Sequence, residues 1–280
     1  LRHGPFTAVT RVRFSYGSPE GEIRNGFAFF VARLKICVLR GHTVKEFAKG
    51  RDLRMEPLIQ MTNIFKTYGA GDVQVAALKQ LNLSIFPGEF AAITGHSGSG
   101  KSTLMNLLGC LDFPSQGEYL LNGESVTELS DRQLSHIRNR QIGFVFQSFH
   151  LIPSLNALEN VELPLLYRGV SRSRRRDLAA RALEQVGLAQ RMRHRPSQVS
   201  GGQQQRVAIA RAIAGEPPIL LADEPTGNLD SASGRQIMDI LINLWRQGRT
   251  LILITHDPDV ARAAPRIICI QDGSITQDSL

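Results

Sequence analysis

The chain has 280 residues, of which 42% are apolar, and this size fits one large α/β domain or two small ones with a substantial core. The longest apolar stretch near the N-terminus, residues 27–39, is interrupted by Arg33 and Lys35 and is shorter than the roughly 18 residues of a membrane-spanning helix. Three widely spaced cysteines fit a reducing compartment and argue against a disulfide scaffold or a cysteine metal site. Because the start of the chain also shows no secretory signal pattern, we expect a soluble, globular protein.

Most of the net charge of +8 belongs to residues 1–54, which hold 11 Lys and Arg against 4 Asp and Glu. This segment has no sustained hydrophobic period, so we expect a basic, poorly ordered extension, either upstream of the true start or dispensable. A basic tail that contacts anionic lipid is the alternative. Residues 55–280 are predicted to form the functional domain, and their near-neutral charge argues against a nucleic-acid partner.

Short alternating apolar runs fill residues 58–90, with turn residues at 69–72 and at 87–88. This pattern predicts an antiparallel strand layer with hairpin turns. Tyr68 stands just before the first turn. An aromatic ring exposed there could stack on a nucleotide base, while the alternative is a tyrosine that packs locally.

The most specific motif of the chain fits G-x-x-x-x-G-K-[ST] at every fixed position and lies between a strand-like run at 90–94 and a helix that begins near Lys101. Its glycines let backbone N–H groups point inward and form a phosphate site at the positive end of the helix. Lys101 is predicted to reach the β- and γ-phosphates, Ser102 to ligate Mg²⁺, and Thr103 to lie near the α-phosphate. The predicted nucleotide-binding residues of this motif are Gly95, His96, Ser97, Gly98, Ser99, Gly100, Lys101, Ser102 and Thr103.

The middle of the chain predicts two more strands and a helical region. Gly109 is expected to end the first helix as its C′ residue, and strands are expected at 117–122 and 141–147. A helical region follows at roughly 155–215. It contains a polar helix whose arginines, at positions 172 and 174–176, are expected to form a solvated face.

The last third contains continuous apolar runs at 219–224, 250–255 and 266–270, with a helix-like segment near 234–247. Continuous runs indicate strands covered on both faces and hence a mostly parallel sheet. Asp223 and Glu224 close the first run, so they should emerge at the carboxyl edge of the sheet, where open α/β folds bind ligands. We expect Asp223 to hold Mg²⁺ through water and Glu224 to orient the attacking water, against the alternative of an acidic helix N-cap.

A second anion-receiving helix start lies at residues 199–206. Ser200 suits an N-cap, and Gly201 and Gly202 leave the backbone bare before Gln203 and an amphipathic helix. One nucleotide has only one γ-phosphate face left open by its own phosphate loop. This second site is therefore expected to serve the nucleotide of another subunit, which predicts a head-to-tail pair.

Over about residues 58–276 these motifs resemble the ATP-binding subunits of ABC transporters. The 95–103 loop resembles the Walker A loop, 199–203 the signature segment, 219–224 the Walker B strand and 227–230 the D-loop. Tyr68, Gln147 and His256 match the A-loop aromatic, the Q-loop glutamine and the switch histidine. Val199 stands where the family usually has Leu. The resemblance implies an α/β fold with a P-loop NTPase (RecA-like) core, a mostly parallel sheet, an antiparallel β subdomain and a helical subdomain inserted at roughly 148–215.

What the resemblance implies for function is an ATPase that uses ATP and Mg²⁺ as a head-to-tail homodimer. Hydrolysis is assigned to Glu224, His256 and Gln147, and Mg²⁺ to Ser102, Gln147 and Asp223. Across the dimer, the nucleotide is expected to be completed by Ser200, Gly201, Gly202 and Gln203.

Residues 107–112, 146–153 and 222–230 resemble the macrolide-export and lipoprotein-release branch of the family. That branch implies a cytoplasmic subunit, peripheral on the inner face of the cell membrane, which powers export or extraction by a transmembrane permease. The chain stops at Leu280 with no spanning segment, so we expect the permease to be a separate chain or the sequence to be a fragment. Part of the surface of the helical region should be apolar and exposed to dock it.

Two other function classes compete with the transporter. A soluble ABC ATPase that acts on ribosomes or DNA usually has two cassettes or long coiled-coil insertions, whereas Lys101 and Ser200 are only 99 positions apart in a single cassette. A nucleotide-sensing module without hydrolysis is disfavoured by the presence of Glu224 and His256. Co-purification with a membrane protein, as against ribosomes or DNA, separates the first alternative from the transporter.

Overall fold

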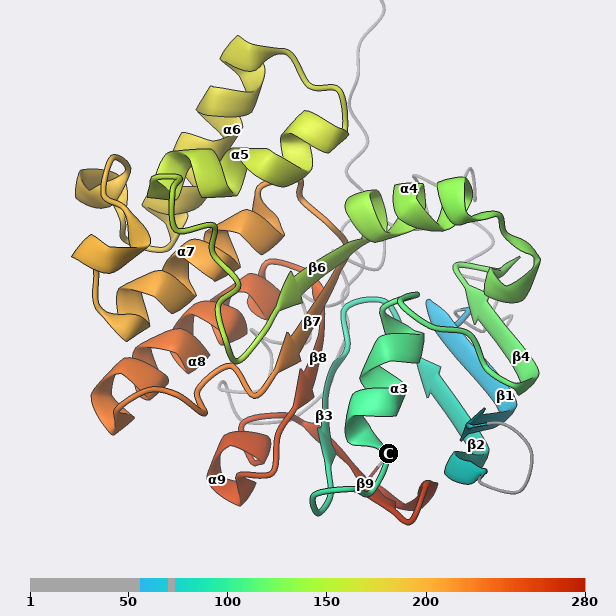
Figure 1. The fold of residues 1–280 in the computed structure, drawn as a ribbon. Helices are drawn as coiled ribbons and strands as arrows, with labels where there is room; N and C mark the ends of the chain where they lie inside the picture. Colours follow the sequence, from blue (N-terminus) through green and yellow to red (C-terminus); the bar gives the residue numbers. More distant parts are fainter. Residues whose placement is uncertain (1–55, 70–73, 280) are drawn as a thin grey trace, which may run out of the picture. The chain divides into compact units, whose positions relative to one another are not determined.

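The computed structural model describes residues 56–69 and 74–279 of the chain (Figure 1). The chain divides into two units, residues 1–54 and 55–280, and every described residue belongs to the second. The predicted basic extension therefore lies outside the described residues, as does most of the turn predicted at 69–72.

An antiparallel sheet of four strands forms the first layer, in the order β2-β1-β4-β5. It consists of β1 (Ile59–Tyr68), β2 (Val75–Ile85), β4 (Gln116–Leu121) and β5 (Glu124–Ser125). Ile59, Met61 and Ile64 of β1 are buried at its core face, and an irregularity in the strand pairing lies between Met61 and Ile64. The alternating apolar pattern thus correctly predicted this layer.

A second sheet of six strands, in the order β10-β9-β3-β8-β7-β6, forms the centre of the domain. Its strands are β3 (Phe90–Thr94), β6 (Ile142–Val145), β7 (Ile219–Asp223), β8 (Thr250–Ile254), β9 (Arg266–Gln271) and β10 (Ser274–Asp278). All neighbours are parallel except β10, which pairs antiparallel with β9. Both faces are covered, which is why these strands read as continuous apolar runs. Since Asp223 pairs with Ile254, the polar residues that follow β7 and β8 meet at one edge.

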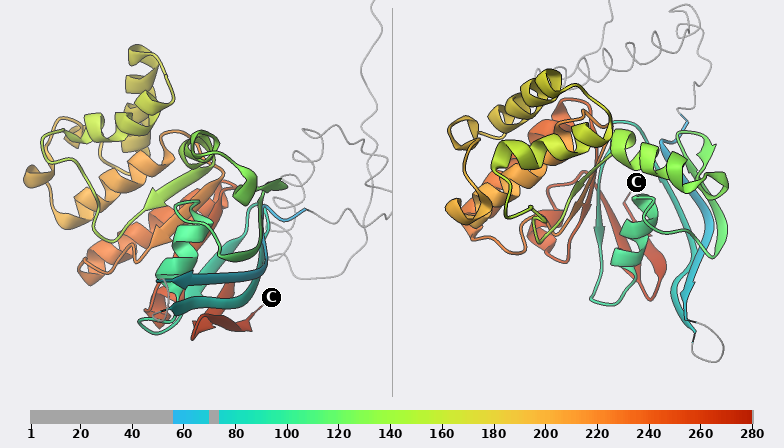
Figure 2. Two further views of the ribbon diagram at one scale, coloured as in Figure 1. Left: turned by 45° about the vertical axis from the view of Figure 1, so that its right-hand side comes forward. Right: turned by 45° about the horizontal axis from the view of Figure 1, so that its top comes forward.

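The helices cover the two faces of this sheet (Figures 1 and 2). One core packs α3 (Lys101–Leu108) and α4 (Asp131–Gln141) between the two sheets. The other core packs the opposite face against α5 (Ala157–Tyr167), α6 (Arg172–Gln185), α7 (Gly201–Ile213), α8 (Ser231–Arg246) and the short α9 (Pro258–Ala261). Single 3₁₀ turns lie at η1 (Val126–Glu128), η2 (Ala189–Arg191) and η3 (Pro196–Gln198). No helix in the described ranges is long and apolar enough to span a membrane.

Three local features differ from the sequence predictions. Helix α4 was not predicted, because its polar sequence buries only Leu134 and Ile137 and has no clear apolar stripe. Gly109 does cap α3, but its φ is −81° and the left-handed residue is Cys110 at 53°. Gly109 is needed instead for space, since a Cβ there would lie 2.5 Å from the ring of Phe144. Of the arginines expected on a solvated face, Arg175 is part-buried and donates to Glu162 at 3.0 Å.

Candidate nucleotide site

A cavity of about 1070 Å³ opens where the carboxyl ends of β3, β7 and β8 meet. Most predicted site residues line it, although they come from four separate segments of the chain. These are Gly95, His96, Ser97, Gly98, Gly100, Lys101, Ser102, Thr103, Gln147, Asp223, Glu224 and His256. The remaining walls are formed by the start of β2 and by the β9–β10 hairpin, including Cys269 and Gly273.

The start of α3, like that of α6, has no side-chain cap, and its N-cap residue is a glycine. Its N-cap is Gly100, with φ of 106°, and no described side chain accepts a hydrogen bond from its first turn. By contrast α5, α7 and α8 are capped by side chains of Asn156, Ser200 and Asp230. The first N–H groups of a helix need an acceptor, and the positive end of the helix dipole favours a negative one. A phosphate group at the loop would fill this role.

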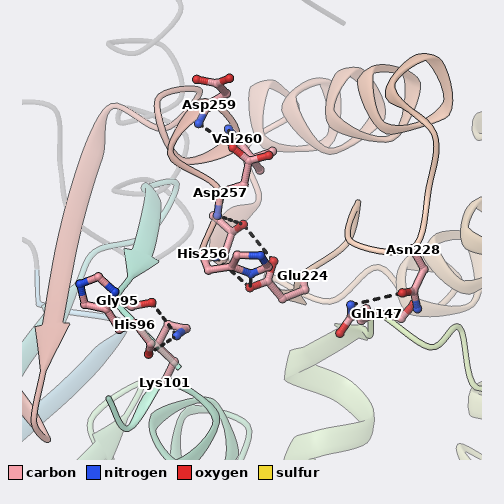
Figure 3. A network of polar contacts seen from close by, with 11 residues as sticks. Gly95, His96, Lys101, Gln147, Glu224, Asn228, His256, Asp257, Asp259 and Val260 are labelled. Carbon is pink, nitrogen blue, oxygen red and sulfur yellow. Dashed lines mark hydrogen bonds and ion pairs between the residues drawn. The ribbon is translucent and has the colours of Figure 1, made fainter. Parts of the chain in front are cut away.

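Lys101 lies folded over the same loop (Figure 3). Its ammonium donates to the carbonyl oxygens of Gly95 at 2.7 Å and His96 at 2.8 Å. Ser99 behaves differently from its neighbours, because it is buried and does not line the cavity. Within the described residues its hydroxyl has no hydrogen-bond partner.

The β9–β10 hairpin contacts the 95–103 loop through a backbone hydrogen bond, which the sequence did not reveal. The N–H of Gly273 donates to the carbonyl of Ser99 at 3.0 Å, and the carbonyl of Gly273 accepts from Lys79 at 2.8 Å. Gly95 packs so closely on β9 that a Cβ there would lie 2.3 Å from the carbonyl oxygen of Ile270. The glycine at position 95 therefore has a packing reason that is independent of ligand binding.

The two acidic residues after β7 have different surroundings. Burial, followed by the charge of Glu224, raises the pKa of Asp223, while Lys101 opposes the shift. Glu224 has a positive φ of 43°, and its N–H donates to the carbonyl of Ile254 at 2.8 Å. Its carboxylate lies 2.5 Å from Nδ1 of His256 and accepts the His256 N–H at 2.8 Å (Figure 3).

The carboxylate of Glu224 has one further partner that sequence reasoning missed. The buried hydroxyl of Thr255 donates to Oε2 at 3.0 Å. The only signal in the sequence was a hydroxyl-bearing residue at the end of an apolar strand, directly before His256.

Gln147 lies on the opposite wall and contacts the segment after β7 (Figure 3). Its Nε2 donates to Oδ1 of Asn228 at 3.3 Å, and Nδ2 of Asn228 donates to the Gln147 carbonyl at 3.2 Å. The fully buried Gln205 of α7 adds a second link, since its Nε2 donates to the carbonyls of Phe146 at 3.2 Å and Pro225 at 2.8 Å. The segments around Gln147, Glu224 and the start of α7 are therefore tied together.

The 199–203 segment is not brought to this cavity. Ser200 is the N-cap of α7 and forms a capping box with Gln203, whose N–H donates to the Ser200 hydroxyl at 3.3 Å. Among the described residues that line the cavity, neither these two nor Gly201 and Gly202 are present. One chain therefore holds a glycine-rich loop with an uncapped helix start and, apart from it, a second helix start that is capped by the side chain of Ser200.

Tyr68 also lies outside the set of cavity-lining residues. Its hydroxyl donates to Asp112 at 2.8 Å, and the Lys66 ammonium lies 4.8 Å from the centre of its ring and 2.6 Å from Asp112. Burial alone would raise the pKa of Asp112, but the hydrogen bonds from Lys66 and Tyr68 outweigh it and lower that pKa. These contacts are those of the locally packed alternative, and base stacking by Tyr68 stays a prediction.

Residues 78–227 match the ABC transporter family. The chain belongs to the ABC transporter family. It is 53% identical to the macrolide export ATP-binding/permease protein MacB of Hahella chejuensis over 223 residues. This match covers 80% of this chain and 34% of MacB. It is also 50% identical to the uncharacterized ABC transporter ATP-binding protein YknY of Bacillus subtilis over 222 residues. This match covers 79% of this chain and 96% of YknY.

A solved ABC cassette has the same fold. The ATP-binding cassette MJ0796, in a dimeric post-hydrolysis structure bound to ADP and Pi, matches with a TM-score of 0.73 and 48% identity over 79% of this chain and 97% of that one. The predicted family, the fold class and the assignment as a nucleotide-binding ATPase are thus confirmed. The chain spans about a third of the length of the macrolide export relatives that it matches. These likenesses favour the transporter over the ribosome- or DNA-acting alternative.

Proposed function

We propose that this chain is the ATP-hydrolysing subunit of an export-type ABC transporter and that two copies close head to tail around two Mg-ATP molecules. One observation carries the proposal. The phosphate loop, Asp223, Glu224 and His256 line one cavity, whereas the 199–203 segment lies outside it. Each nucleotide would then be cradled by one subunit and capped by Ser200 and Gly202 of the other. The dimeric state of the MJ0796 cassette supports this arrangement.

The donors that face the cavity fit a magnesium ion brought in by a nucleotide. Ser102, Gln147 and Asp223 offer oxygen atoms around one space. Mg²⁺ is usually held by one or two carboxylates together with substrate phosphates. The described residues contain no group of three or more His, Cys, Asp or Glu side chains that could hold a metal alone. When bound, Mg²⁺ would neutralise charge on the phosphate oxygens.

Within this proposal the chain's own residues share the chemistry. Lys101 would release its two loop carbonyls and donate to the phosphates, together with the uncapped N–H groups of α3. Glu224 would accept a proton from the attacking water. His256 would donate to the γ-phosphate, a role for which single donors commonly contribute about 3 kcal/mol. Gln147, which directly precedes the helical region, would transmit the change to that region, and its hydrogen bond to Asn228 would couple it to the segment after β7.

The surface around α5 is proposed to dock the permease at the inner face of the cell membrane. Leu166 and Tyr167 end α5 with 52% and 82% of their surface exposed, and Ile152 is 42% exposed. A cavity of about 320 Å³ next to the end of α5 is lined by Phe146 and Pro164 together with polar residues such as Arg138 and Arg168. Exposed apolar surface of this kind marks interaction sites. Similarity to the MacB proteins supports an exporting or extracting permease as the partner, and the transported compound would be selected there.

The test uses Glu224→Gln, which preserves the size of the side chain but removes the base. This variant should bind ATP and accumulate closed dimers, while its steady-state ATP hydrolysis falls by about 10² to 10⁴. Steady-state hydrolysis by the variant at the wild-type rate would refute the role of Glu224. Co-purification of the wild-type chain with ribosomes or DNA, and not with a membrane protein, would refute the transporter assignment.

A further inference from the structure

The end of β8 fixes both oxygens of the Glu224 carboxylate through two adjacent residues. The hydroxyl of Thr255 donates to Oε2 at 3.0 Å, and the backbone N–H of His256 donates to Oε1 at 2.8 Å. Because each donor takes a different oxygen, the pair sets the direction of the carboxylate and the tilt of its plane.

Thr255 is itself fixed by burial and by hydrogen bonds from its backbone and its side chain. Its side chain is fully buried, and its N–H donates to the carbonyl of Ile93 in β3 at 3.1 Å. Its hydroxyl accepts the N–H of Asp257 at 3.1 Å while it donates to Glu224. A β-branched residue has few χ1 states, and here two hydrogen bonds select one of them. The hydroxyl is therefore a fixed donor.

Glu224 needs such a support because its side chain has three rotatable bonds and would otherwise sample many poses. The ring of His256 lies close to the same carboxylate, yet that side chain is 68% exposed. In the proposed function the His256 side chain turns toward the γ-phosphate and moves away from the Glu224 carboxylate. Thr255 and the backbone N–H of His256 are then the remaining partners among the contacts described for the carboxylate.

We propose that Thr255 is a positioning residue, which keeps the Glu224 carboxylate aimed at the attacking water after His256 has turned to the nucleotide. The inference rests on the proposed role of Glu224 as the base. Thr255 does not line the cavity, so it does not touch the nucleotide itself, and its hydroxyl reaches the reacting groups through the hydrogen bond to Glu224.

The experiment compares Thr255→Val, which keeps the shape but removes the hydroxyl, with Thr255→Ser, which keeps the hydroxyl. Small misplacements of a reacting group can lower rates by as much as about a hundredfold, so we expect the Val variant to lose at least about tenfold in kcat. Its KM for ATP and its ATP-driven dimerisation should stay within about twofold of wild type, because binding does not use the carboxylate. The Ser variant should keep most of the wild-type kcat.

A separate variant, Glu224→Gln, distinguishes failure of the proposed function from failure of the inference about Thr255. If Glu224→Gln retains hydrolysis, the proposed function fails. If it abolishes hydrolysis while Thr255→Val retains the wild-type kcat, the inference alone is overturned. A loss in Thr255→Ser as large as in Thr255→Val would also overturn it, because packing and not the hydroxyl would be responsible. Thr255→Ala, which creates no overlap, replaces the Val variant if ATP binding shows that the latter does not fold.

Discussion

The β9–β10 turn should control how firmly the phosphate loop is held, and Gly273→Ala tests this. Gly273 has a φ of +84°, and a Cβ there would lie 2.7 Å from the carbonyl oxygen of Ala77 and 3.1 Å from Cα of Leu78. Its own backbone bonds join Ser99 of the loop to Lys79 of β2. An added methyl group must therefore push the turn away from β2, which would strain the hydrogen bond from Gly273 to Ser99 of the loop.

The magnitude follows from two separate effects. A left-handed backbone costs a non-glycine residue about 1–2 kcal/mol. Overpacking against backbone atoms adds about 1–3 kcal/mol. Gly123 provides a matched control, because its φ is +81° and no described atom beyond its chain neighbours lies within 4 Å of its Cβ position. Gly123→Ala should thus show only the first effect, and Gly273→Ala should be less stable by a further ~1–3 kcal/mol.

The assay is urea unfolding followed by the fluorescence of the single tryptophan, Trp245, which packs against Phe90 in the core. Each kcal/mol should also lower the melting temperature by about 2–4 °C in a domain of this size. ATP affinity, measured beside stability, should fall only in Gly273→Ala. Equal stability of the two variants, together with wild-type ATP affinity in both, would refute the idea that this turn supports the loop.

Three further predictions concern Lys101, Cys269 and Cys110. Lys101→Ala should weaken ATP binding about tenfold to a hundredfold, since a charged hydrogen bond contributes ~1.5–3 kcal/mol, and calorimetry with a normal affinity would count against the phosphate-loop assignment. Cys269 lines the cavity and is part-exposed, so in a Cys37→Ser background Mg-ATP should slow its alkylation at pH 8. Burial raises the pKa of Cys110 to about 11, so this thiol stays protonated at pH 8 and mass spectrometry should find it labelled only after unfolding. Equal labelling of Cys269 with and without nucleotide would place the nucleotide elsewhere.

What the sequence predicted well depends on local patterns. The buried strands β7 and β8 follow from continuous apolar runs, and the turn between β3 and α3 follows from glycines between a strand and a helix. The position of Asp223 at the carboxyl edge follows from the same strand boundary. These inferences need only the chain neighbours of each residue.

What the sequence did not predict depends on contacts between distant segments. Gly273 supports Ser99 although they are far apart in the chain, and Thr255 reaches Glu224 only because β7 and β8 are paired. No period or motif encodes such pairs. Helix α4 was not predicted for a different reason: with only two buried residues, its apolar stripe is too weak to be recognised in the sequence.

The central claim is that each ATP is shared by two chains, and mixing two inactive variants tests it most directly. Lys101→Ala disables the phosphate loop of its own subunit. Ser200→Asp preserves an N-cap residue for α7 but places a negative charge where the 199–203 segment would meet the γ-phosphate bound by the other subunit. In a mixed head-to-tail dimer one site has both defects and the other has neither. The account predicts ATP hydrolysis well above the sum of the two separate variants, whereas a mixture as inactive as its components would contradict it.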